Sequence, residues 1–195
     1  MNDLILASGS PRRKELLEIA HLPFTIQKSS VHEKITGIKS PDQVVEELAL
    51  RKARDIQSIN QKSVVLGADT VVALNGQIFG KPKTEQDAID MIHRLSGNKH
   101  AVFTGVAIVY NDQETIFHEK TEVTFWKLTD NEIESYVRTG ESMDKAGGYG
   151  IQGLGSTLVK AIFGDYYNVV GLPIARTVRE LKPYGITQDL SQSRK

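Results

Sequence analysis

Residues 4–17, LILASGSPRRKELL, constrain the fold most, because they specify a strand, a tight turn and a helix in immediate succession. The apolar residues 4–7 predict a short strand, and Pro11 after the Ser8-Gly9-Ser10 turn suits the first position of a helix. Arg12 and Arg13 then fall where the helix dipole normally attracts acidic side chains. Free backbone N–H groups, hydroxyls and guanidinium groups at that point suit a phosphate. A solvated basic helix start with an ordinary cap explains the same residues, so both interpretations stay open here.

Further along the chain, predicted helices and strands alternate, with antiparallel hairpins inserted. Ser40, Thr84 and Thr129 are predicted N-caps, and Asn75-Gly76 predicts a hairpin turn. Beyond the opening strand, the expected strands are 23–27, 63–73, 77–79, 101–110, 115–126 and 158–163. The expected helices run from 11 to about 21, 41–59, 85–96, 130–138 and 173–181. This order predicts a mixed α/β domain over residues 1–185, followed by a polar tail at 186–195.

The overall charge excludes several classes of partner. Lys and Arg number 24, as do Asp and Glu, so no net field draws the protein to nucleic acid or to an anionic membrane. The chain has no cysteine, which excludes disulfides, thiolate nucleophiles and Cys-ligated zinc. The first apolar run is too short for a signal peptide or a membrane span, and we therefore expect a cytoplasmic protein.

Asp69 is the most informative single residue. It interrupts the apolar run 63–73, SVVLGADTVVA, where an acid costs several kcal/mol unless it is paired, metal-bound or exposed at a strand end. A general base or a metal ligand accounts for an acid held on a rigid strand. A strand-end aspartate that caps a neighbouring turn is the structural alternative.

The basic residues Arg12, Arg13, Lys52 and Lys81 are each, taken alone, typical of a solvated surface. Lys81 is the better candidate for a ligand contact, because Gly80 and Pro82 fix a turn around it. The same caution applies to Glu33, since most loop glutamates are hydrated.

A glycine-dense segment, 140–155, is expected to form a shaped loop without regular elements, approached closely by a ligand or another part of the backbone. The chain contains neither a P-loop sequence nor a strand-borne GxGxxG. The five histidines are spread without metal-ligand spacing, which favours surface or packing roles for them.

Taken together, LILASGSPRRKELL, GADTVV, GKP, LSGNKHAVFTGV and MDKAGGYGIQG resemble the Maf family of nucleoside triphosphate pyrophosphatases. The resemblance extends over almost the whole chain. It implies an elongated, two-lobed α/β protein with a mixed twisted sheet, flanking helices and a central cleft, similar to inosine-triphosphate pyrophosphatases. It also implies cleavage of a nucleoside triphosphate to the monophosphate and pyrophosphate with a divalent cation, Mg²⁺ or Mn²⁺.

The same resemblance assigns roles to individual residues. Asp69 matches the catalytic carboxylate that accepts a proton from the attacking water, and Glu33 matches an acid implicated in catalysis or metal binding, so Glu33 and Asp69 are the expected metal ligands. The positions that match the phosphate site of the family are Ser8, Arg12, Arg13, Lys52 and Lys81, of which Lys52 and Lys81 are expected to assist catalysis. Arg12, Thr70 and Gln152 match the branch of the family that acts on dTTP and UTP.

We therefore expect a housekeeping hydrolase of dTTP and UTP, with CTP and modified uridine triphosphates as further substrates. Gln152 offers a donor and an acceptor for the imide edge of a pyrimidine, and Thr70 is small enough to admit a base beside it. The alternative is a nucleotide-binding regulator of cell division that inhibits septum formation without catalysis. A sensor needs the basic cradle but no buried base, so Asp69 distinguishes the two. The resemblance is also compatible with a homodimer.

Overall fold

The computed structural model describes residues 2–32, 37 and 40–192. The chain divides into two compact units. Unit 1 consists of Met1–Asp69, Thr104–Glu119 and Gly171–Lys195, and unit 2 consists of Thr70–Phe103 and Lys120–Val170. The division therefore falls between Asp69 and Thr70, which are neighbours on one strand.

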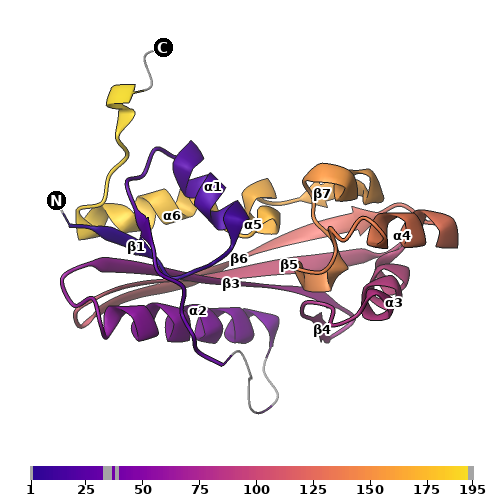
Figure 1. Cartoon of the computed structure of the whole chain (residues 1–195), viewed down its shortest axis with the longest axis horizontal. Coiled ribbons are helices and arrows are strands. Elements are labelled where there is room, and N and C mark those ends of the chain that lie inside the picture. The colour runs from indigo at the N-terminus through magenta and orange to yellow at the C-terminus, as the bar shows by residue number, and fades with distance from the viewer. Residues whose placement is uncertain (1, 33–36, 38–39, 193–195) are drawn as a thin grey trace. The chain divides into compact units, whose positions relative to one another are not determined.

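Helices and strands are interspersed along the chain, and in two places one strand follows another directly (Figure 1). The strands are β1 (Leu4–Leu6), β2 (Thr25–Ile26), β3 (Val64–Leu74), β4 (Gln77–Phe79), β5 (Lys99–Tyr110), β6 (Gln113–Phe125) and β7 (Val159–Phe163). The α-helices are α1 (Pro11–Ile19), α2 (Pro41–Gln57), α3 (Glu85–Leu95), α4 (Asp130–Val137), α5 (Tyr166–Val170) and α6 (Ile174–Leu181). Four short 3-10 helices complete the described elements: η1 (Ala146–Gly148), η2 (Gly153–Leu158), η3 (Lys182–Tyr184) and η4 (Leu190–Gln192).

The strands form a seven-stranded mixed sheet in the order β2-β1-β3-β5-β6-β7, with β4 paired to β3. β1 is parallel to both β2 and β3, and Ile5 lies opposite Val65. The β3–β4 and β6–β7 pairs are antiparallel, and the second carries a bulge at Thr124 and Phe125. The predicted α/β class with a mixed sheet and flanking helices is confirmed.

In unit 1, α2 packs very closely against the sheet. A methyl group on Gly67 would lie 2.3 Å from the Ala49 carbonyl oxygen, and one on Gly105 would lie 2.4 Å from the Val45 carbonyl oxygen. Glycine at these strand positions therefore lets the helix backbone touch the sheet. The surrounding core consists of small and aliphatic side chains: Ile5, Ala7, Ala49, Ala53, Ile56, Val65, Ala107 and Val109. This close packing fixes the distance between the α2 backbone and the sheet, and so places the α2 side chains relative to β3.

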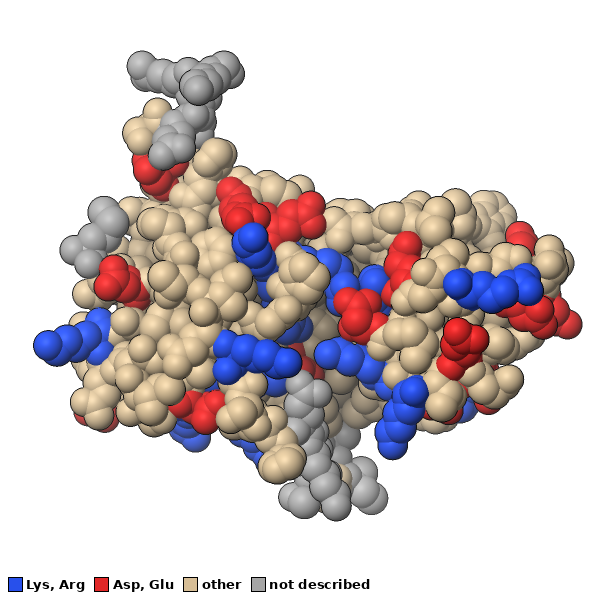
Figure 2. All heavy atoms as spheres, in the orientation of Figure 1, with Lys and Arg blue, Asp and Glu red and all other residues tan. Residues whose placement is uncertain are grey.

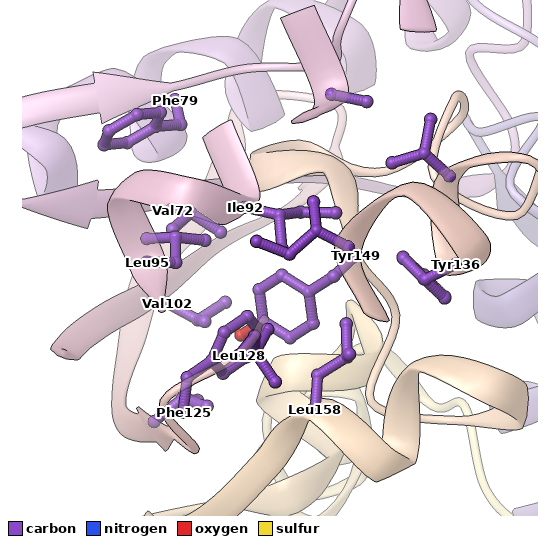
Figure 3. Packing of buried hydrophobic residues seen from close by; sticks show 14 residues of the cluster. Val72, Phe79, Ile92, Leu95, Val102, Phe125, Leu128, Tyr136, Tyr149 and Leu158 are labelled. Carbon is purple, nitrogen blue, oxygen red and sulfur yellow. The ribbon is translucent and has the colours of Figure 1, made fainter. Parts of the chain in front are cut away.

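In unit 2, aromatic rings fill the core. The Tyr149 side chain points into the middle of the cluster, close to Phe125 and Leu128 (Figure 3). The rings of Phe125 and Tyr149 pack edge-to-face with centroids 4.6 Å apart, and His100 packs edge-on against both. Edge-to-face contacts of this kind add to the stabilisation that burial of the rings supplies.

Most helix starts follow their predicted caps. The Thr84 hydroxyl accepts a hydrogen bond from the Asp87 backbone N–H at 3.1 Å, and the Thr129 hydroxyl accepts one from Glu132 at 3.3 Å. Each of these acidic side chains bonds back to the N-cap backbone, which completes the capping box. At α1, Pro11 occupies the first turn as predicted, but the Ser10 side chain makes no cap bond.

Two expectations about irregular segments need correction. The glycine-dense segment contains the short helices η1 and η2, so the expectation that it holds no regular element is wrong. Gly147, Gly148 and Gly153 of this segment have φ angles of 72°, 73° and 60°, a backbone conformation that glycine adopts without a steric penalty. The helix α5 was not predicted at all, because its five residues are too few to show a helical period.

Within the described residues, no helix has the length and hydropathy to cross a bilayer. Acidic and basic side chains are both spread over the visible face (Figure 2), as expected for a chain with zero formal net charge.

Candidate active site

A buried ion pair lies at the point where α2 crosses β3 in unit 1. Lys52 Nζ donates to Asp69 Oδ1 at 2.6 Å, and each side chain is only 12% exposed. The attraction between the two charges offsets the hydration energy that each loses on burial. Asp69 lies inside β3, so the alternative of a strand-end capping acid is wrong, as is a solvated surface position for Lys52.

Arg13 anchors the turn that precedes α1. Its Nε donates to the Gly171 carbonyl oxygen at 2.8 Å, and its Nη1 donates to Ser8 Oγ at 3.1 Å. Ser8 Oγ also accepts from the Ser10 backbone N–H at 3.2 Å. Arg13 and Ser8 are both buried, so the solvated interpretation is wrong for Arg13. With both lone pairs of Ser8 engaged, its hydroxyl proton is the part that can be offered to a ligand.

Lys28 is a candidate that sequence reasoning missed. β1 and β2 are parallel, with Leu6 opposite Ile26, so the residues that follow each strand lie at the same sheet edge. A methyl group on Gly9 would lie 3.2 Å from Lys28 Cδ, so the lysine side chain packs against the Ser8–Ser10 turn. Arg12, in the first turn of α1, is half-buried. No local sequence pattern identifies Lys28 as a candidate, because only the pairing of β1 with β2 brings it to the Ser8–Ser10 turn.

Unit 2 holds the remaining described candidates. Thr70 is half-buried on β3, and Lys81 is exposed just beyond β4. The Gly147 backbone N–H donates to the Gly80 carbonyl oxygen at 3.0 Å. A methyl group on Gly147 would lie 2.8 Å from Val72 Cγ2, so this part of the glycine-rich segment rests on β3. The turn before Lys81 is thereby tied to the segment that leads to Gln152, whose side chain is half-buried.

The structure therefore brings together Lys52 with Asp69, and Ser8 with Arg13, inside unit 1. Thr70, Lys81 and Gln152 belong to unit 2. Glu33 lies outside the described residues. Among the residues that are described, no three His, Asp or Glu side chains form a group able to hold a metal ion, so the metal ligands stay a prediction.

Comparison with solved structures defines the class of fold. The structure of the Staphylococcus aureus Ham1 protein matches with a TM-score of 0.50 at 15% identity, covering 81% of this chain and 80% of that one. At this identity the likeness shows the shared fold alone.

The sequence comparisons define the family. The Maf-like protein model matches residues 3–184, so the chain belongs to the Maf family. The dTTP/UTP pyrophosphatase of Halalkalibacterium halodurans is 55% identical over 187 residues, covering 96% of this chain and 98% of that protein. The dTTP/UTP pyrophosphatase of Bacillus pumilus is 54% identical, covering 96% of this chain and 99% of that protein. The family resemblance deduced from the motifs is confirmed.

Proposed function

We propose that this protein is a nucleoside triphosphate pyrophosphatase that hydrolyses dTTP and UTP to the monophosphate and pyrophosphate. Near-full-length relatives named for that activity support the substrate class. The observation that carries the chemistry is the buried Lys52–Asp69 pair, a carboxylate and an ammonium on rigid elements. CTP and modified uridine triphosphates are proposed as secondary substrates.

Asp69 acts as the general base in this proposal. Its Oδ1 is occupied by Lys52, whereas Oδ2 has no hydrogen bond within the described residues and is the oxygen offered to water. Asp69 accepts a proton as the water oxygen bonds to the α-phosphorus, and the bond from that phosphorus to the pyrophosphate oxygen breaks. Lys52 stays beside the carboxylate and offsets negative charge as the triphosphate approaches.

The turn before α1 is proposed to bind phosphate. Arg13 and Ser8 fix its shape through the hydrogen bonds already described, and Arg12 and Lys28 bring further positive charge to it. Backbone N–H groups at the start of α1 add partial positive charge. Lys81 is proposed to neutralise charge on the leaving pyrophosphate.

A divalent ion fits the chemistry of the donors. Mg²⁺ and Mn²⁺ prefer hard oxygen ligands, and Mg²⁺ is commonly held by one or two carboxylates together with substrate phosphates. A carboxylate has about four lone-pair sites, so Asp69 can supply one such ligand beside its bonds to Lys52 and the water, and Glu33 is the proposed second. When bound, the ion supplies Lewis-acid polarisation of the phosphoryl oxygens.

Thr70 and Gln152 are proposed to read the base. The Gln152 amide can donate to a carbonyl oxygen of uracil or thymine and accept from its imide N–H. The competing proposal is a regulator that binds nucleotide without catalysis. Such a protein does not require a buried carboxylate as a base, so the Lys52–Asp69 pair favours the enzyme.

The decisive test measures pyrophosphate release from dTTP, UTP, CTP, GTP and ATP with Mg²⁺ or Mn²⁺. We expect the wild type to prefer dTTP and UTP. Asp69→Asn keeps the size of the side chain and an oxygen for Lys52 but lacks the base, and we expect its kcat to fall by about 10²- to 10⁴-fold. Asp90→Asn, an exposed substitution on α3, is the matched control and should leave kcat unchanged. Absence of release by the wild type from every triphosphate would overturn the proposal.

A further inference from the structure

Residues 150–155 of unit 2 form a narrow loop whose two ends touch. A methyl group on Gly155 would lie 2.1 Å from the Gly150 carbonyl oxygen and 2.9 Å from Tyr136 Oη. Only glycine lets the backbone close at this distance. Gln152 lies within this closed loop.

Tyr136 holds the first end of the loop. It lies on α4, is buried, and its Oη accepts a hydrogen bond from the Gly150 backbone N–H at 3.1 Å. The same hydroxyl donates to Glu141 Oε1 at 3.3 Å. Burial raises the pKa of the Tyr136 hydroxyl, so it keeps the proton that this donation requires.

Glu141 holds the second end. Its Oε2 accepts from the Leu154 backbone N–H at 3.1 Å, and its Oε1 accepts from the Gly155 backbone N–H at 3.2 Å. These N–H groups belong to the first turn of η2, where a helix has no internal acceptors for them. A carboxylate that accepts backbone N–H bonds is among the stronger hydrogen-bond partners in proteins.

Tyr136 and Glu141, with the backbone N–H groups that they bind, form a frame around Gln152, and Lys145 stabilises this frame. Its Nζ donates to the Glu141 carbonyl oxygen at 2.5 Å and to Asp144 Oδ1 at 2.7 Å. Its chain lies against Gly150, where a methyl group would be 2.7 Å from Lys145 Cε. The acid that holds one end of the loop is thus itself held in place.

Gln152, by contrast, makes no side-chain hydrogen bond within the described part of the chain. Its backbone is extended, and it immediately precedes η2. The hydrogen bonds of Tyr136 and Glu141 therefore fix the backbone on both sides of a polar amide for which the described residues supply no partner.

We infer that Tyr136 and Glu141 are positioning residues that hold Gln152 for base recognition and so set the preference for uracil and thymine. The inference rests on the proposed function, because it takes Gln152 as the base reader. A polar group discriminates between bases only if it is held where a wrong base leaves it unpaired, so a loosened frame lowers selectivity.

The test compares kcat/KM for UTP with kcat/KM for GTP in the full-length protein. Where GTP turnover is too slow to follow, its Ki against UTP hydrolysis replaces it. Tyr136→Phe removes the acceptor for Gly150, and Glu141→Gln replaces one of the acceptor oxygens with an NH₂ group that cannot accept. We expect each variant to lower the UTP/GTP ratio by about tenfold, with little change in kcat for GTP.

A double-mutant cycle separates positioning from general damage. If the frame acts through Gln152, Tyr136→Phe should have no further effect on the ratio once Gln152→Ala is present. Glu132→Gln is the matched control. It removes a carboxylate from α4, the helix that carries Tyr136, where Glu132 Oε2 accepts from the backbone N–H of the N-cap residue Thr129, and it leaves residues 150–155 unchanged. It should lower stability and leave the ratio unchanged.

Three results would overturn the inference: a UTP/GTP ratio unchanged by Glu141→Gln, effects fully additive with Gln152→Ala, or a ratio unchanged by Gln152→Ala itself. If Tyr136→Phe does not fold, Glu141→Gln carries the same test. Failure of the proposed function is distinguishable, because it would appear in the wild type as the absence of pyrophosphate release from any triphosphate.

Discussion

The two compact units bury ionisable side chains in different ways. Unit 1 buries charged side chains beside polar or charged partners: Lys52 pairs with Asp69, and Arg13 donates to Ser8 and to a backbone carbonyl. Unit 2 keeps its most deeply buried titratable groups neutral, in an aromatic core built around Tyr149. The first arrangement keeps charged groups in the interior beside their partners, whereas the second fills the interior with neutral rings.

His100 illustrates the neutral arrangement. Its Nε2 shares a hydrogen bond of 2.8 Å with the Tyr149 hydroxyl, and its Nδ1 is buried without a partner among the described residues. Burial lowers the pKa of His100 from 6.5 to about 4, because a charged imidazole would lose its hydration with no carboxylate to replace it. Burial also raises the pKa of the Tyr149 hydroxyl, which therefore stays protonated.

The largest expected effect comes from breaking the ion pair of unit 1. Lys52→Met leaves the Asp69 carboxylate buried without its counter-charge, and we expect it to lower the free energy of unfolding at pH 7 by roughly 3 kcal/mol, measured by urea denaturation. Arg54→Met, on the same helix, breaks an ion pair with Glu114 in which the arginine side chain is 59% exposed. It should cost less than about 1 kcal/mol. Equal losses from the two variants would contradict the difference between buried and exposed charge.

The second effect concerns pH and unit 2. Between pH 6.5 and about 4 the unfolded chain protonates His100 while the folded protein does not, so the free energy of unfolding falls as the pH falls through this window. We expect this residue to make the protein about 2 kcal/mol less stable at pH 5 than at pH 7. His100→Phe should lose that part of the pH dependence in urea denaturation, while His93→Gln, at an exposed histidine, should keep it. Identical pH profiles for His100→Phe and the wild type would show that folding does not lower the pKa of His100.

The smallest effect distinguishes the helix starts of the two units. Thr84 caps α3 in unit 2, and Thr84→Ala should cost about 1 kcal/mol in thermal or urea unfolding. Ser10 makes no side-chain cap bond at α1 in unit 1, so Ser10→Ala should change stability by only a few tenths of a kcal/mol, about 0.3. A loss at Ser10 as large as that at Thr84 would mean that the Ser10 hydroxyl does cap α1.

Local signals predicted the elements well. Thr84, Thr129 and Asn75-Gly76 act within a few residues of themselves, so the caps and the hairpin turn could be placed before the fold was known. The helix α5 and the short helices of the glycine-rich segment could not, because no period develops over so few residues.

The candidate site was only partly predictable. Asp69 was conspicuous because an acid interrupts an apolar run, but its partner Lys52 looked like any surface lysine until α2 was seen to pack on β3. The burial of Arg13 depends on the carbonyl of Gly171, far along the chain. Tyr136 and Glu141 bind backbone N–H groups, and such contacts leave no pattern in residue types.

The contact between Gly150 and Gly155 has a practical consequence for redesign. Because the loop is closed by its own backbone and by side chains outside positions 151–153, the residue at 152 can be exchanged without rebuilding the frame. A library that varies position 152 alone therefore samples new base preferences on one unchanged scaffold. A library that also varies the two glycines mixes those preferences with misfolding, and its inactive members say nothing about recognition.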